Sequence, residues 1–133
     1  MRYATGLKYG YYHIRLSEEA GNLCAIVLPW VKYKYKCLPM GVYSSPDIFQ
    51  VKMNELFHVF EFIRAYINDL LIINKGDWFD HLEKLKLTIQ NNKDNRLKCN
   101  IEKLLFRQTD MEYMGFWVTR NGILPVNKNY KPW

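Results

Sequence analysis

Cysteine is scarce in this sequence, and no two cysteines lie close together. The three residues, Cys24, Cys37 and Cys99, are an odd number without close spacing. This pattern argues against a disulfide framework and against the paired cysteines of zinc ribbons and knuckles. Reduced thiols are typical of intracellular proteins, so we expect an intracellular location, in the cytoplasm or nucleus.

Long apolar runs, a signal-peptide pattern, repeats and low-complexity tracts are also missing. No window approaches the ~18 consecutive apolar residues of a membrane-spanning helix. The first residues lack the charged and apolar regions of a secretory signal. The three histidines, His13, His58 and His81, are scattered along the chain. The sequence therefore indicates neither a membrane protein nor a histidine-based metal site.

The residues that are present suit one small domain with an excess of positive charge. The 133 residues are 49% hydrophobic and include ten tyrosines, seven phenylalanines and four tryptophans. These side chains are sufficient for a modest core. The formal net charge of +6 favours an anionic partner, and nucleic acid is the natural candidate.

The first half of the chain is predicted to form two strands and one helix. Residues 7–16 and 23–37 have strand character and are separated by a polar turn at 17–22. A helix is expected to begin at Ser45, whose hydroxyl can cap it, with Pro46 and Asp47 in its first turn. Its predicted buried face, spaced by four, three and four residues, comprises Phe49, Met53, Leu56 and Phe60.

The second half is predicted to contain another helix and a hairpin. Asp77 can cap this helix, and the polar run 91–96 is expected to end it, while Lys84 and Lys86 stay in solvent. The predicted apolar stripe comprises Phe79, Leu82, Leu85 and Ile89. A hairpin is expected at 111–124, with its turn at Arg120, Asn121 and Gly122. Together these elements predict an α+β fold, a small antiparallel sheet backed by two helices.

Between the two predicted helices, residues 62–73 place a polar pair, Asn68 and Asp69, between two apolar runs of strand type. Such a pair favours a tight hairpin turn whatever the protein does. The hairpin becomes informative because of the segments around it. In chain order these are 7–16, 38–50, 81–85, 97–103, 111–118 and 122–125.

In this order and spacing, the segments resemble the reverse transcriptase of LTR retrotransposons, closest to the gypsy type, over essentially the whole chain. The resemblance implies a polymerase palm with a partial fingers segment. It also implies RNA-directed DNA polymerase activity, a nucleotidyltransferase reaction on an RNA or DNA template-primer with deoxynucleoside triphosphates.

The same resemblance indicates that most of the metal-binding acids are missing. The family pattern has three catalytic aspartates, which fall on Gly6, Asn68 and Asp69, so Gly6 and Asn68 are expected to lie side by side at the sheet surface with Asp69 adjacent. Acids of this kind hold two Mg²⁺ or Mn²⁺ ions, which activate the primer hydroxyl and neutralise the triphosphate. Asn68 can offer only a neutral carbonyl oxygen, and Gly6 offers no side chain. We therefore expect an incomplete metal site at Asp69 and negligible polymerisation.

Four further residues take catalytic or nucleotide-binding roles by resemblance. Tyr11 matches the aromatic residue under the incoming sugar, and Met40 and Gly41 match the stretch that approaches the nucleotide. Lys103 matches a lysine regarded as the proton donor to pyrophosphate. Each position also has a structural interpretation: Tyr11 in the core, Gly41 in a turn, and Lys103 as a solvated charge beside Glu102.

Candidate nucleic-acid contacts come from the first predicted helix and from residues before and after it. Gln50, inside the helix start, matches a family position near the template, although a solvent-facing glutamine is equally compatible with the sequence. Tyr66 lies in the segment that matches the catalytic hairpin. Independently of the family, Lys32, Lys34 and Lys36 alternate along one predicted strand and so share one of its faces. Such a stripe can follow phosphates, but it can equally protect an edge strand from unwanted pairing.

Residues 1–133 are predicted to form a single reverse transcriptase-like domain, without most of the fingers and without thumb, RNase H and integrase regions. We favour an inactive remnant of a retrotransposon polyprotein, because of the missing acids. The alternatives are an active polymerase part completed by other chains, and a domesticated module that binds nucleic acid or a protein without chemistry. Metal binding distinguishes the active part, and salt-dependent nucleic-acid binding distinguishes the binding module from an inert fragment.

Overall fold

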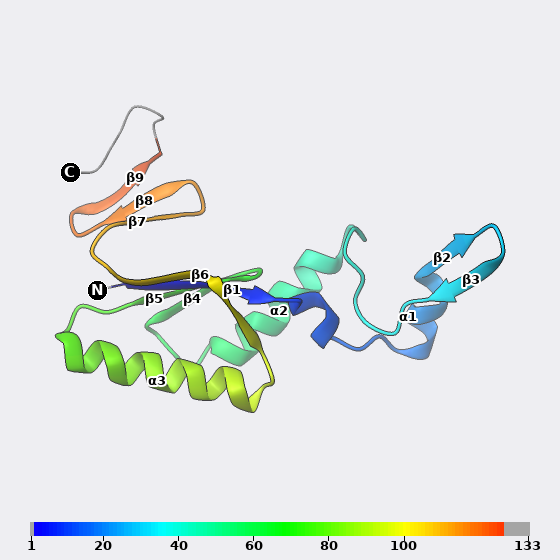
Figure 1. The fold of residues 1–133 in the computed structure, drawn as a ribbon, viewed down its shortest axis with the longest axis horizontal. Helices are drawn as coiled ribbons and strands as arrows, with labels where there is room; N and C mark the ends of the chain where they lie inside the picture. The colour runs from blue at the N-terminus through cyan, green and yellow to red at the C-terminus, as the bar shows by residue number, and fades with distance from the viewer. Residues whose placement is uncertain (1, 127–133) are drawn as a thin grey trace.

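The structure, a computed structural model, describes residues 2–126 and is shown in Figure 1. In chain order, its elements are β1 (Arg2–Lys8), the 3₁₀ helix η1 (Gly10–His13), α1 (Glu18–Leu23), β2 (Ala25–Leu28), β3 (Val31–Lys34), α2 (Ser45–Phe57), β4 (Ile63–Tyr66), β5 (Asp69–Ile73), α3 (Trp78–Asp94), β6 (Lys98–Gln108), β7 (Met111–Tyr113), β8 (Phe116–Thr119) and β9 (Gly122–Pro125).

The central layer is a four-stranded antiparallel sheet in the order β4-β5-β1-β6. Helices α2 and α3 lie on one face of this sheet, and the small sheet β7-β8-β9 lies beyond the other (Figure 1). The segment α1-β2-β3 extends away from this body. The predicted α+β fold, an antiparallel sheet backed by two helices with a partial fingers segment, is therefore confirmed.

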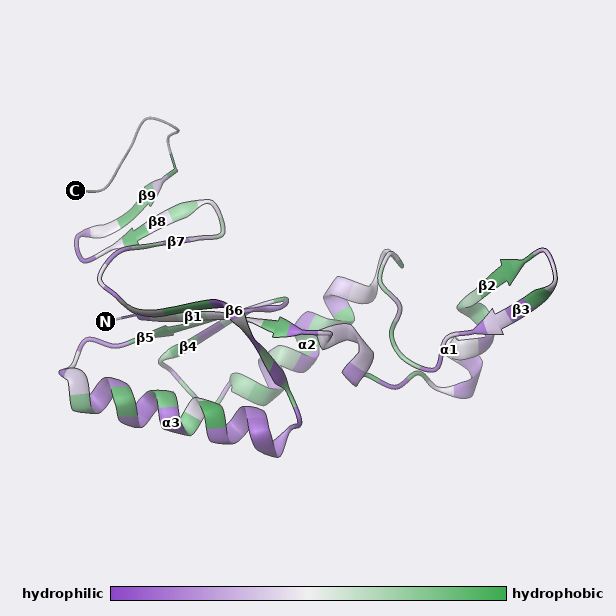
Figure 2. Cartoon of the chain, viewed as in Figure 1, coloured by the Kyte–Doolittle hydropathy of each residue, from purple (hydrophilic) through white to green (hydrophobic). Residues whose placement is uncertain are grey.

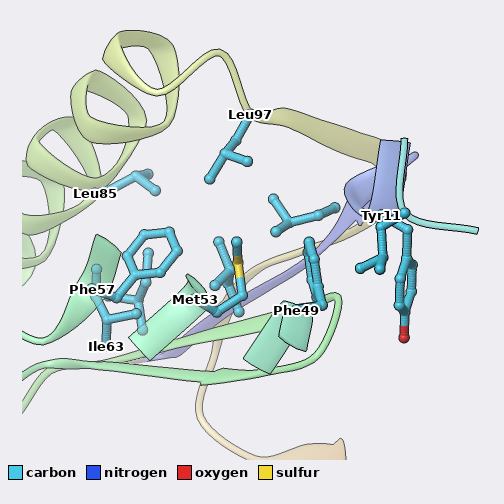
Figure 3. Close-up of a cluster of buried hydrophobic side chains, with 11 residues drawn as sticks. Tyr11, Phe49, Met53, Phe57, Ile63, Leu85 and Leu97 are labelled. Atoms are coloured by element: carbon cyan, nitrogen blue, oxygen red, sulfur yellow. The ribbon is translucent and has the colours of Figure 1, made fainter. Parts of the chain in front are cut away.

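The core lies between the sheet and the two helices, as Figure 3 shows. Helix α2 contributes Phe49, Met53 and Phe57, which are at most 4% exposed. The predicted face at Phe49 and Met53 is confirmed, while Leu56 and Phe60 are only partly buried against the core. Each fully buried side chain of this size stabilises the fold by ~1.5–3 kcal/mol relative to exposure.

The start of α2 differs from the prediction in one detail. Pro46 and Asp47 lie in the first turn as expected, but the helix already begins at Ser45, and Ser44 is the N-cap residue. The Ser45 hydroxyl is fully buried and donates a 2.7 Å hydrogen bond to the carbonyl of Pro39. It therefore anchors the preceding loop and does not cap the helix.

Helix α3 is capped as predicted, but it buries a different face. Asp77 Oδ1 accepts a 2.9 Å hydrogen bond from the Asp80 amide. Of the predicted stripe only Leu85 is buried, whereas Phe79 is 78% exposed. The other two stripe residues, Leu82 and Ile89, are also exposed.

The buried residues of α3 are His81, Leu85, Thr88 and Asn92. Polar side chains can occupy this face because they find partners. Thr88 donates to the Lys84 carbonyl at 2.9 Å, and Asn92 donates to Cys99 Sγ at 3.2 Å. The Lys84 side chain is only 28% exposed and its ammonium pairs with Asp80 at 2.8 Å, so the prediction of a solvated Lys84 is wrong.

Helix α3 ends at Asp94, within the polar run 91–96 that was predicted to end it. Asn91 stays helical with its side chain donating to the Leu56 carbonyl at 3.3 Å. The chain leaves the helix at Arg96, which has a φ of 57°, in the left-handed region. The asparagines are therefore compatible with the helix because their amides bond to neighbouring groups.

The predicted strands at 7–16 and 23–37 are confirmed only in part, and the predicted turn at 17–22 is wrong. Strand β1 ends at Lys8, because Tyr9 turns the chain with a φ of 56° into η1. Residues 17–22 enter a short helix, α1, capped by Ser17. The second stretch folds back on itself as the β2-β3 hairpin, in which Leu28 pairs with Val31.

The C-terminal hairpin is confirmed and gains a third strand. Strands β8 and β9 are joined at Arg120 and Asn121, since Thr119 pairs with Gly122. Strand β7 adds to β8 through a tight turn at Met114 and Gly115, both with positive φ.

The surface carries many exposed apolar side chains. Figure 2 shows apolar residues along β2, where Val27 is 74% exposed, and Trp30 in the turn that follows is 78% exposed. Within residues 2–126, none of the helices has the length and apolar character needed to cross a membrane.

Candidate functional site

The central hairpin β4-β5 has a two-residue turn formed by Ile67 and Asn68, because Tyr66 pairs directly with Asp69. The predicted tip at Asn68 and Asp69 is therefore shifted by one residue, and Asp69 opens β5. Ile67 has a φ of 47°. A β-branched residue in the left-handed region is strained, so neighbouring contacts must hold this turn.

Gln50 of α2 provides two of these contacts. Its Oε1 accepts a 2.6 Å hydrogen bond from the Ile67 amide, and its Nε2 donates to the Ala65 carbonyl at 3.0 Å. A third hydrogen bond, of 2.8 Å, joins Nε2 to Asn54. The resemblance placed Gln50 near the template, but the structure binds both ends of its amide to the protein itself.

The three positions of the lost catalytic trio lie together. Gly6 pairs with Asp69 across β1 and β5, and the Leu7 amide donates to the Asn68 carbonyl at 2.6 Å. A Cβ atom added to Gly6 would lie 3.6 Å from Asp69 Oδ1. The expectation that Gly6, Asn68 and Asp69 share one place on the sheet is confirmed by this register.

Asn68 is half-buried, and its side-chain oxygen faces Gly10. A Cβ on Gly10 would lie 2.7 Å from Asn68 Oδ1 and 2.6 Å from Phe49 Cζ, so only glycine fits there without a shift. Within the described part of the chain, Asn68 Oδ1 is buried without a hydrogen-bond partner. The one polar atom that could replace a carboxylate oxygen is thus enclosed beside the core.

Asp69 is exposed, and Tyr113 lies beside it. The Tyr113 hydroxyl donates a 3.3 Å hydrogen bond to the backbone carbonyl of Asp69. Burial, together with the negative charge of Asp69 and the neighbouring Tyr66, raises the pKa of Tyr113 to about 12. Sequence analysis missed Tyr113, although it lies in one of the motif segments, because its proximity to Asp69 depends on how the β7-β8-β9 sheet packs.

A two-metal site is not supported by these residues. Over residues 2–126, no group of three or more His, Cys, Asp or Glu side chains is placed to hold a metal ion. Carboxylates supply both the oxygen ligands and the charge that Mg²⁺ requires, and here one carboxylate stands beside a glycine and an enclosed amide. The residues present therefore do not fit the pair of dications that the family pattern implies.

Tyr11 and the Met40-Gly41 pair lie in different surroundings. Tyr11 is 8% exposed and stacks on Phe49 with ring centroids 4.9 Å apart (Figure 3), and burial raises its pKa. Met40 is exposed, and Gly41 has a φ of 92° in the loop before α2. Both line a cavity of about 580 Å³ between this loop and α1. The role of Tyr11 in the core is thus established, whereas its predicted nucleotide contact stays a prediction.

The predicted lysine stripe lies on the β2-β3 hairpin. Lys32 and Lys34 lie on β3, whose residues are all exposed, and Lys36 follows the strand. The ammonium of Lys34 bonds to Asn22 Oδ1. Lys34 and Lys36 line one surface hollow together with Arg15. The structure thus places a third cation, Arg15, near Lys34 and Lys36. The spacing of the lysines in the sequence did not predict this arrangement.

The comparison with protein families decides the identity of this arrangement. The model described as "Reverse transcriptase (RNA-dependent DNA polymerase)" matches residues 5–118, which include Gly6, the hairpin and Lys103. The chain belongs to the reverse transcriptase family. The expected resemblance to reverse transcriptases is thereby confirmed at the level of the family.

Similar polyproteins come from viruses and from a transposon. This reverse transcriptase-like chain is 32% identical over 122 residues to the enzymatic polyprotein of Soybean chlorotic mottle virus, covering 90% of the chain and 18% of the polyprotein. It is 29% identical over 119 residues to the Retrovirus-related Pol polyprotein from transposon opus of Drosophila melanogaster, covering 88% and 12% respectively. The chain therefore spans less than a fifth of these relatives and is a reverse transcriptase-like domain of retroelement polyproteins.

A solved structure with the same fold is the foamy viral protease-reverse transcriptase in complex with RNA/DNA hybrid. The TM-score is 0.86 at 16% sequence identity, and the match covers 96% of this chain and 17% of the foamy viral chain. At this identity the likeness shows the fold alone, and it agrees with the predicted palm.

Proposed function

We propose that this chain is the palm region of a gypsy-type LTR retrotransposon polyprotein that is intracellular and does not polymerise DNA by itself. The single observation that carries the proposal is the register of Gly6 with Asp69. The position of the first catalytic acid lies beside the last one, and it has no side chain.

The physical reason is uncompensated charge. Two divalent ions ~3.5–4 Å apart need several carboxylates, because each brings two positive charges into a small volume. One carboxylate leaves most of that charge unbalanced. Each ~1.4 kcal/mol lost from transition-state stabilisation slows the reaction about tenfold, so the loss of two acids abolishes useful synthesis.

A primer-extension assay tests this proposal directly. The chain is incubated with an RNA or DNA template-primer, deoxynucleoside triphosphates and either Mg²⁺ or Mn²⁺. We expect no more incorporation than with the Asp69→Asn variant, which lacks the remaining acid. Extension above that control would contradict the proposal and would favour an active polymerase part in which another acid holds the metals.

A second candidate function, nucleic-acid binding without chemistry, is favoured by the basic hollow. Three cations, Arg15, Lys34 and Lys36, line this hollow together with one acid, Glu18, and Lys32 lies on the same hairpin. The net charge of the chain is +6. Lysines that contact phosphates release counterions, which makes binding fall steeply with salt. The foamy viral relative, which shares this fold, was solved with an RNA/DNA hybrid.

Replacing Lys32, Lys34 and Lys36 by Ser tests this second function. We expect the affinity for RNA–DNA hybrid or single strands to fall and its salt dependence to flatten. The matched control removes three other exposed lysines, Lys75, Lys86 and Lys93, and should retain most of the affinity and slope. Equal losses in both triple variants would mean that the lysines of the hairpin serve only as edge protection and general charge.

A further inference from the structure

Helix α3 carries an apolar stripe on the side that faces away from the core. The helix forms the outer layer of the sheet body (Figure 1), and three of the four residues that it buries are polar. Its large apolar side chains lie elsewhere: Phe79 is 78%, Leu82 37% and Ile89 53% exposed. The helix therefore turns a mainly polar face to the domain and leaves an apolar stripe uncovered.

The stripe has the spacing of helices that pair with one another. Five exposed residues follow at steps of three, four, three and four, and we call them the α3 seam: Phe79, Leu82, Lys86, Ile89 and Lys93. This is the a/d spacing of a coiled coil over two heptads. Lysines are compatible with such a seam, because their aliphatic stems cover apolar surface while the ammonium stays in water. The seam therefore has the geometry needed to contact a second helix.

The α3 seam is complementary to itself when two copies lie antiparallel. If Phe79 faces Ile89 of a second copy, the same register places Leu82 opposite Lys86 of that copy. Glu83 follows Leu82 and so lies next to the same Lys86, and each contact occurs twice by symmetry. Glu83 and Lys86 are exposed, and neither takes part in the ion pairs found among the described residues. Antiparallel packing also places the positive end of each helix dipole beside the negative end of the other.

We propose that the α3 seam is a docking surface for a second copy of this chain, which binds through an antiparallel pair of α3 helices. Across this pair Phe79 packs on Ile89, and Glu83 bonds to Lys86. One pair of helices of this length buries less than the ~800 Å² per partner of a stable complex, so the dimer is reversible, with a Kd on the order of 100 µM. The inference concerns association alone and requires neither polymerisation nor nucleic-acid binding.

Sedimentation equilibrium of the full chain, over about 10–500 µM protein, tests whether the α3 seam associates. The salt concentration is about 0.15 M, which screens the repulsion between two copies of net charge +6. We expect a monomer–dimer equilibrium that Phe79→Ser weakens at least about tenfold. The control Tyr43→Ser, which removes an aromatic side chain that is 97% exposed outside α3, should leave it unchanged. A monomer at every concentration would overturn the inference. Equal association of Phe79→Ser and the unaltered chain would also overturn it, by assigning the contact to another surface such as the apolar β2-β3 hairpin.

Charge reversal tests the antiparallel register. Glu83→Lys and Lys86→Glu each place like charges across the pair, so each variant alone should dimerise about fivefold more weakly. An equimolar mixture of the two should associate more tightly than either variant, because every pair across the heterodimer then joins a lysine to a glutamate. The control mixture of Glu83→Lys with Lys75→Glu has the same net charge and should show no such gain. A test mixture that associates no more tightly than its components would refute the register and the inference with it. Neither measurement bears on primer extension or nucleic-acid binding, so the proposals fail separately.

Discussion

Gln50 is expected to stabilise the hairpin that carries Asp69, and Gln50→Met tests this. Methionine has a similar length but cannot bond to the Ile67 amide or the Ala65 carbonyl, which Gln50 contacts at 2.6 and 3.0 Å. Each such hydrogen bond contributes ~0.5–1.5 kcal/mol, so together they account for about 1–3 kcal/mol. For a domain of this size that loss lowers Tm by about 4–10 °C.

The assay is urea unfolding combined with hydrogen exchange at the Ile67 amide. We expect a lower midpoint with an unchanged m-value, and faster exchange at Ile67, because its acceptor has been removed. Gln90→Met is the control, because Gln90 is exposed on α3 and bonds to its helix neighbour Asp94 at 2.7 Å. If Gln50→Met destabilises the chain no more than Gln90→Met does, the hairpin does not depend on Gln50 and the reasoning is refuted.

Three further predictions concern packing and protonation. Gly10→Ala should lower the free energy of unfolding, measured in urea, by ~1–3 kcal/mol, because the added Cβ would lie 2.6 Å from Phe49 Cζ. Recovery of stability by Phe49→Leu in the same background would identify this clash, and an unchanged unfolding midpoint in Gly10→Ala would contradict it. Burial lowers the pKa of His81 below the ~6.5 of the unfolded chain. The unfolded state therefore binds the proton more tightly, and the free energy of unfolding should fall from pH 7 to pH 5. His81→Leu should reduce this dependence of stability on pH, and the control His58→Gln should not. In ultraviolet titration Tyr113, with a pKa raised to about 12, should ionise after most other tyrosines; a late component that persists in Tyr113→Phe would assign it elsewhere.

The sequence predicted those parts of the fold that depend on local pattern. The spacing of Phe49 and Met53 identified the buried face of α2, since most residues buried there are apolar. The same reasoning failed on α3, where Thr88 and Asn92 are buried with hydrogen bonds to Lys84 and Cys99. A rule based on apolar spacing cannot detect buried polar residues whose partners lie in other elements or in the backbone.

The site was predictable to a similar extent. The motif order correctly placed Gly6 beside Asp69, because the register of β1 and β5 follows from the family fold. The turn was misplaced by one residue, since a left-handed Ile67 contradicts local preference. The Cδ atom of Lys103 lies 3.0 Å from the place where a Gly6 Cβ would be, because β6 bulges against β1 there. Such a contact between strands far apart in the sequence leaves no local signal.

The contacts around β4 also determine how this sheet can associate with other chains. Strand β4 is an edge of the sheet, and an exposed edge offers backbone groups to which another strand can add, which is a common route to aggregation. Here the Ala65 carbonyl is taken by Gln50, and the Ile63 carbonyl is taken by the Arg64 guanidinium at 2.9 Å. A strand from a second molecule would have to displace both side chains. The hydrogen bonds of Gln50 that hold the hairpin turn therefore also oppose the addition of further strands that would extend the sheet into fibrils.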